Sequence, residues 1–121
     1  EARRMVYALK VRMEQDGIFG AFDCPDGSLV MPRRANSTTP LQSLNLWNSA
    51  FVLQQAAALA ERVQQDAGTA PDAQIERAFL LAFQRTPNPR ERAAARTLVA
   101  GQGLVPLCRA LLNSNEFLYV P

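Results

Sequence analysis

The chain has 121 residues with 13 basic and 11 acidic side chains, so its formal net charge is +2. Apolar residues make up 48% and charged residues 20%, which is typical of a packed globular domain and excludes an intrinsically disordered chain. Histidine is absent, so the commonest general base and metal ligand is excluded. The balanced charge argues against nucleic acid as a partner. No apolar run approaches the ~20 residues of a membrane-spanning helix, and no transmembrane segment is expected.

The two cysteines, Cys24 and Cys108, lie far apart and form no C-x-x-C motif for a metal or for haem attachment. A disulfide between them and two separate buried thiols both stay open. The chain begins at Glu1 inside a segment that already has the pattern of an element. We therefore expect a piece of a longer protein, with no metal and no cofactor in this piece.

Residues 2–14 fit two kinds of element, because their apolar residues follow both a strand and a helix period. We favour a helix, since no downstream segment offers a partner strand. Residues 15–38 are rich in glycine, proline and polar residues, and irregular connections of this length are often functional. Residues 1–38 are thus expected to form an irregular N-terminal part with one helix or strand.

Helix signals begin at Thr39. The run Thr39-Pro40-Leu41-Gln42 predicts a capping box with proline in the first helical position. Leu44 and Trp47 continue the face of Leu41, which predicts that Trp47 lies in the core. Asn48 or Ser49 is the predicted cap of a second helix, which Gly68 ends.

Three more helices are predicted from the same signals. One opens at Thr69-Ala70-Pro71-Asp72, and another opens at Asn88-Pro89-Arg90-Glu91 and stops near Gly101. The last carries the apolar stripe Leu104, Leu107, Cys108 and Leu111, with Pro106 tolerated in its first turn. Short connections favour antiparallel neighbours. The expected fold is mainly α: a single domain in which residues 39–121 form a small bundle of four to five helices.

Several motifs stand in a fixed order along the chain: Phe22-Asp23-Cys24-Pro25-Asp26, Thr39-Pro40-Leu41-Gln42-Ser43-Leu44, Arg85-Thr86-Pro87 and Leu111-Leu112-Asn113-Ser114-Asn115-Glu116-Phe117. Together they resemble the C-terminal part of the PSD-one family, a planctomycete cytochrome-associated domain of unknown function. The resemblance runs from about residue 3 to the end. It implies an exported or periplasmic multidomain protein, with any haem in domains upstream of this piece.

The expected function is a non-catalytic packing or protein-interaction domain at the C-terminal end of such a protein. Its partners would be upstream domains of the same chain or another protein. The alternative is a small-ligand or carbohydrate-binding module, or part of an enzyme site that upstream domains complete. The sequence does not decide whether the chain is an enzyme, but the missing catalytic set favours a non-catalytic role.

The candidate binding or structural loop consists of Asp23, Asp26, Arg33, Arg34 and Asn36. Carboxylates and guanidinium groups on an irregular loop are typical of a ligand cleft. They are equally typical of a turn closed by an aspartate and held to the bundle by an arginine–carboxylate pair, which we favour. No catalytic, cofactor-binding or metal-binding residue is assigned.

Two further clusters have a structural and a functional interpretation. Arg85, Arg90, Arg92 and Arg96 surround the fourth helix, and either bind an anion or form an ordinary charged face; Glu91 inside the cluster favours the latter. The run 113–116 is expected to stop the last helix in a capped turn, which packs Phe117, Leu118 and Tyr119 against the core.

Overall fold

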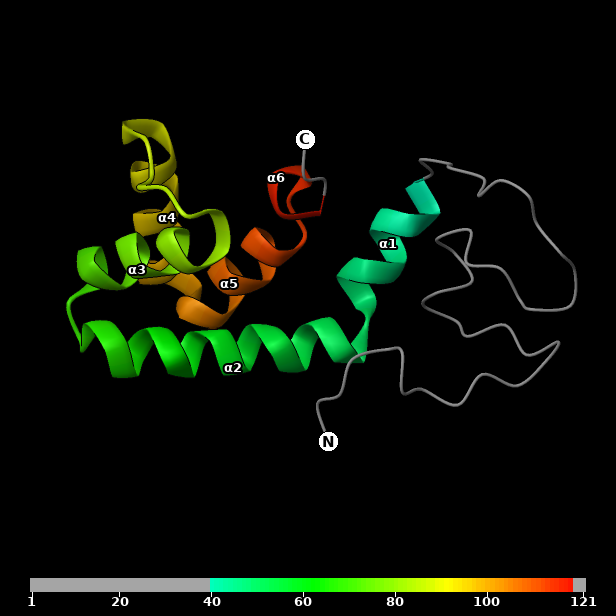
Figure 1. The fold of residues 1–121 in the computed structure, drawn as a ribbon, viewed down its shortest axis with the longest axis horizontal. Coiled ribbons are helices and arrows are strands. Elements are labelled where there is room, and N and C mark those ends of the chain that lie inside the picture. Colours follow the sequence, from blue (N-terminus) through cyan, green and yellow to red (C-terminus); the bar gives the residue numbers. More distant parts are fainter. Residues whose placement is uncertain (1–39, 119–121) are drawn as a thin grey trace, which may run out of the picture. The chain divides into compact units, whose positions relative to one another are not determined.

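The computed structural model describes residues 40–118, and within this range it contains six α-helices and no strand (Figure 1). The helices are α1 (Pro40–Asn48), α2 (Ala50–Ala67), α3 (Pro71–Phe83), α4 (Pro89–Gln102), α5 (Leu104–Leu112) and α6 (Asn115–Leu118). The predicted mainly α fold is confirmed. The expectations for residues 1–38, for the helix cap at Thr39 and for the packing of Tyr119 fall outside the described residues.

The chain divides into two compact units, residues 1–45 and 46–121. The first unit contains the beginning of α1. The second contains the end of α1 and all of α2 to α6, and every contact discussed below lies within it.

Helices α2, α3 and α4 begin at the predicted residues. The Ser49 side chain accepts a hydrogen bond from the Val52 N–H at 3.5 Å and caps α2. Asn88 caps α4 in a full capping box: its Oδ1 accepts from the Glu91 N–H at 2.9 Å, while its own N–H donates to Glu91 at 2.7 Å. α3 begins at Pro71 without a side-chain cap, because Ala70 occupies the capping position.

Residues with positive φ end three of these helices. Gly68 after α2 and Gly103 after α4 have φ of 68° and 88°, values that glycine adopts without steric cost. Gln84 after α3 has φ of 58°, in the left-handed region that favours glycine or asparagine.

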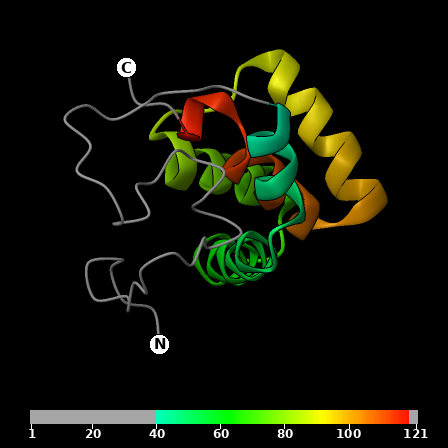
Figure 2. The same cartoon turned by 90° about the vertical axis from the view of Figure 1, so that its right-hand side faces the viewer.

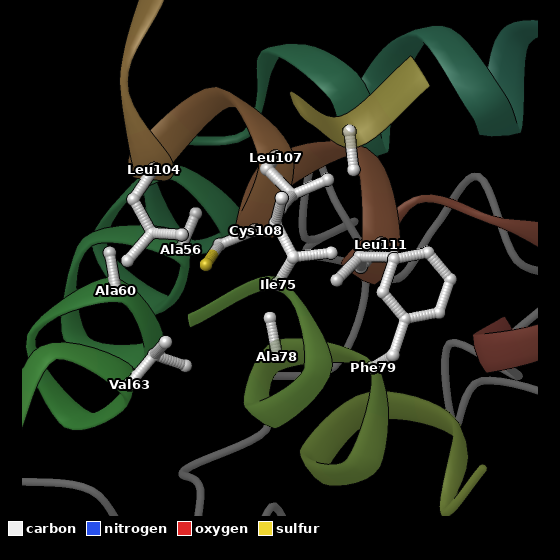
Figure 3. Close-up of a cluster of buried hydrophobic side chains, with 11 residues drawn as sticks. Ala56, Ala60, Val63, Ile75, Ala78, Phe79, Leu104, Leu107, Cys108 and Leu111 are labelled. Atoms are coloured by element: carbon white, nitrogen blue, oxygen red, sulfur yellow. The ribbon is translucent and has the colours of Figure 1, made fainter. Parts of the chain in front are cut away.

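The core lies where α3 and α5 pack against α2, and Figure 2 shows α2 nearly end-on. α4 closes the bundle against α3 and α5. Alanines at 56 and 60 let the facing helices approach α2 closely, and Val63, Ile75 and Cys108 are the largest fully enclosed side chains (Figure 3). The predicted stripe of α5 is confirmed, since all four of its residues are buried.

Two predicted core positions are wrong. Trp47 is 42% exposed and Leu44 is 57% exposed. The Trp47 ring is instead covered by the Arg109 guanidinium, which lies 4.2 Å from the ring centroid and also donates from Nε to the Trp47 carbonyl at 3.1 Å. This cation–π contact holds the indole at the surface rather than in the core.

The residues after α5 also differ from expectation. They form the short helix α6 rather than a turn packed inward, and Phe117 and Leu118 are 42% and 37% exposed. One helical turn cannot bury all of its faces, and α6 directs these two side chains outward.

Candidate functional site

The predicted loop of Asp23, Asp26, Arg33, Arg34 and Asn36 lies outside the described residues. The structure therefore leaves both interpretations of this loop as predictions. The sites that can be built from geometry all lie on the helical unit.

Arg85 joins three helices at one point. Its guanidinium donates to both oxygens of Glu91 at 2.8 and 2.7 Å, and to both oxygens of Glu116 at 2.7 and 2.8 Å. The fifth N–H donates to the Thr86 carbonyl at 3.2 Å. All five donors of the arginine are thus used, and the ends of α3, α4 and α6 are tied together.

The ionisation of this cluster follows from its geometry. The hydrogen bond from Arg85, followed by that from the Asn88 N–H, lowers the pKa of Glu91 to about 2. Arg85 likewise lowers the pKa of Glu116, and the two carboxylates raise the pKa of Arg85. The cluster is fully ionised near neutral pH, which suits a structural clamp rather than proton transfer.

The arginines around α4 are not brought together into an anion site. Each forms an ion pair between neighbouring helices, with one exception. The pairs are Arg92 with Glu76 at 2.9 Å, Arg96 with Asp72 at 2.5 Å and, nearby, Arg77 with Asp66 at 2.7 Å. Arg90 makes no ion pair among residues 40–118. The cluster therefore holds helices together, a role more specific than the solvated face expected.

The turn between α5 and α6 is capped at both ends, as predicted. The Ser114 hydroxyl donates to the Leu111 carbonyl at 2.7 Å and accepts from the Phe117 N–H at 3.3 Å. The Asn113 amide donates to the Arg109 carbonyl at 2.8 Å. These bonds fix the direction of α6, so the position of Phe117 is set by both Ser114 and the Arg85 clamp.

An open groove of about 360 Å³ lies on this unit between α2, α3, α5 and α6. It is mainly apolar, and Phe117 of α6 is the aromatic side chain among the described residues that line it. The residues that line it are Gln55, Ala58, Leu59, Arg62, Leu81, Ala82, Leu112 and Phe117. Among these described residues, Arg62 is the single charged group.

No sequence motif marks this groove, because its lining residues come from four different helices. One signal pointed towards it. From Ala35 to Ala60 the chain contains no charged residue, and this run covers the first half of α2. Exposed Phe51 and Leu53 lie in the same stretch. An uncharged exposed helix surface is typical of an interface core, from which charged residues are depleted.

Cys108 is a free thiol in the core with no exposed surface. Burial raises its pKa to about 11, so it is neutral and poorly reactive in the folded state. Its position is that of a small apolar residue, one of the two alternatives that the sequence left open. Cys24 lies outside the described residues.

Residues 40–118 contain neither a cluster of metal-binding side chains nor a membrane-spanning helix. Within that range, no three or more histidine, cysteine, aspartate or glutamate side chains gather as they would around a metal ion. None of the helices that the structure describes is both long and apolar enough to cross a membrane.

Comparison with known families identifies the class to which the chain belongs. A family model described as protein of unknown function DUF1553 (PSD1) matches residues 1–99. The chain is therefore a member of the DUF1553 family, in agreement with the motifs that lie within residues 1–99; the run 111–117 lies beyond the matched range. No curated protein and no solved structure matches it significantly.

Proposed function

We propose that the chain is a non-catalytic packing or protein-interaction domain of a larger, exported, cytochrome c-associated planctomycete protein, in which it occupies the C-terminal end. The observation that carries the proposal is the contrast between the two kinds of surface on the helical unit. Most charged side chains among residues 40–118 form ion pairs with one another, whereas large apolar side chains such as Phe51 and Phe117 remain exposed.

The carboxylates support a structural role. Among residues 40–118 every carboxylate except Glu61 is in an ion pair, and the pKa values of Asp66, Asp72, Glu91 and Glu116 are lowered by arginine. General acid–base catalysis works best with a pKa near the working pH. These groups are shifted the opposite way, as expected for side chains that stabilise helix packing.

Haem is a cofactor that the cytochrome association implies, but this chain does not fit it. Covalent attachment uses a C-x-x-C-H motif, and the chain contains neither that motif nor any histidine. The thiol of Cys108 is enclosed in the core. The proposal therefore places haem in upstream domains, and places the whole protein in the periplasm or another exported compartment.

The proposal is tested by mixing the purified chain with the upstream part of its parent protein. Light scattering coupled to size-exclusion chromatography should detect a complex of one copy of each, and the haem absorption should belong to the upstream part alone. Failure to bind, together with a glycan or metabolite that raises the melting temperature of the chain, would instead establish the ligand-binding alternative.

A further inference from the structure

The groove between α2, α3, α5 and α6 has the composition of a helix-binding surface. We propose that it docks an amphipathic helix whose apolar face covers Phe117 and whose carboxylate meets Arg62. The inference rests on the interaction role proposed above and assigns that role a surface and a partner chemistry.

The apolar lining explains why a helix fits. Leu59, Leu81 and Leu112 in the lining are half-buried, and Ala58 and Ala82 are small enough to allow close approach. An amphipathic helix binds such grooves through anchors spaced at i, i+3, i+4 and i+7. Phe117 is an exposed aromatic residue on a fixed helix, the type of residue that most often dominates binding energy.

The positive charge of Arg62 in the lining favours a partner that carries a carboxylate. Arg62 has a side chain that is 64% exposed, and its Nε lies 3.5 Å from Asp66 Oδ2. That same oxygen already accepts two hydrogen bonds from Arg77, at 2.9 and 2.7 Å. The terminal nitrogens of Arg62 make no hydrogen bond to any described residue. They are therefore available to a carboxylate, and none of the described residues that line the groove is acidic.

The shape of the groove favours a protein segment over a small molecule. Small-molecule sites usually enclose most of the ligand surface. This groove is open to solvent, and Phe117 in its lining is itself 42% exposed. A helix, which presents one face only, matches a surface of this kind.

The test titrates the full chain with two synthetic peptides. Both carry leucines at i, i+3, i+4 and i+7; one has a glutamate beside them and its twin has a lysine there. Nuclear magnetic resonance of the ¹⁵N-labelled chain should show the glutamate peptide shifting amides of the groove residues, and binding about tenfold more tightly than its twin.

Three variants sharpen the result. Arg62→Glu should reverse the preference between the two peptides, whereas Arg90→Glu, an equal change of charge at an arginine outside the groove, should leave it intact. Phe117→Ala should weaken both peptides by about tenfold or more. Circular dichroism checks that each variant remains folded.

Equal binding of the two peptides, or an unchanged preference in Arg62→Glu, would overturn the inference. It would also be overturned if decanoate occupied the groove and the peptides did not, or if sedimentation showed that a second copy of the chain covers it. The interaction role itself is judged separately: if Arg62→Glu still binds the upstream part as the unaltered chain does, the role stands and the groove is not its surface.

Discussion

Gln84 ends α3 with a left-handed backbone although it carries a side chain. Its N–H donates to the Leu80 carbonyl at 3.0 Å, so the hydrogen bond that closes the helix is made regardless of residue type. What the side chain adds is steric conflict between its Cβ and the backbone. The position therefore stores strain that a glycine would remove.

Replacing Gln84 with glycine should stabilise the chain by ~1 kcal/mol, because glycine adopts the left-handed conformation without the steric conflict of a Cβ atom. The matched control is Gln65→Gly on the exposed side of α2, which should destabilise by about 0.5–1 kcal/mol. Urea unfolding followed by circular dichroism measures both. A destabilised Gln84→Gly variant would show that the side chain makes a contact that matters more than its strain.

Cys108 offers a second prediction at this scale. Because its thiol is enclosed and its pKa is raised to about 11, iodoacetamide should leave it unmodified in the native chain and label it only in urea. Peptide mass spectrometry distinguishes it from Cys24. If native Cys108 were labelled as fast as an exposed thiol, its burial in the core would be contradicted. If mass spectrometry found a disulfide-linked peptide containing both cysteines, the assignment of Cys108 as a free thiol would be contradicted.

At the scale of elements, arginine–carboxylate pairs connect α2 to α3, α3 to α4, and α3 and α4 to α6. Isolated exposed ion pairs contribute little to stability, since water and salt weaken them. Arg85 is the exception in geometry, because two bidentate carboxylates and a carbonyl share one rigid guanidinium. Its side chain also lies over the rings of Phe79 and Phe83, at 5.8 and 5.4 Å from their centroids.

Arg85→Lys should lower the melting temperature by on the order of several degrees, because an ammonium group keeps the charge but cannot bind two carboxylates bidentately. Arg90→Lys is the control, since Arg90 has no ion pair within residues 40–118. This variant should have the same melting temperature as the unaltered chain. Differential scanning calorimetry compares the three. If Arg85→Lys and the unaltered chain had equal melting temperatures, the Arg85 cluster would contribute no more stability than an ordinary surface ion pair.

The same clamp predicts loss of stability in acid. The pKa of Glu91 is lowered from 4.5 to about 2, so the stabilisation is complete above the unfolded value and is lost as pH falls towards the folded one. Lowered pKa values at Glu116, Asp66 and Asp72 act in the same direction. The melting temperature should stay level from neutral pH to about 5 and then fall between 4.5 and 2. In Glu91→Gln, the melting temperature should decrease less over the same pH range than in the unaltered chain.

Helix positions were predictable because their signals are local. Asn88-Pro89-Arg90-Glu91 predicts a cap from four adjacent residues, and the structure confirms it. Trp47 and Phe117 were assigned wrongly because their burial depends on residues distant in sequence. Arg109 lies 62 residues from Trp47, and the groove lining combines four helices, so neither has a local pattern. The candidate loop of Asp23 to Asn36 remains a prediction.

At the scale of the whole molecule, the division after residue 45 leaves α2 to α6 with a core of their own. All eleven residues of that core lie between Ala56 and Leu111, and the Arg85 clamp is complete within the same unit. A unit with its own core and complete ion pairs meets the requirements for independent folding.

A fragment of residues 46–121 should therefore unfold in one cooperative transition, within a few degrees of the full chain. A shorter fragment of residues 46–112 keeps the core but loses Glu116 and α6, and should melt lower. Circular dichroism melts of the three chains provide the comparison. A broad, non-cooperative melt of residues 46–121 would show that the core depends on the first 45 residues.

The arginine-only chemistry of the bundle has a practical consequence. Lys10 is the only lysine of the chain, and residues 40–118 contain no primary amine. Reagents that acylate amines, including those that couple proteins to sensor surfaces or attach dyes, would react at Lys10 or at the amino terminus. They would leave the ion pairs and the groove chemically unaltered, so a labelled or tethered chain would present the same bundle surface as the free one.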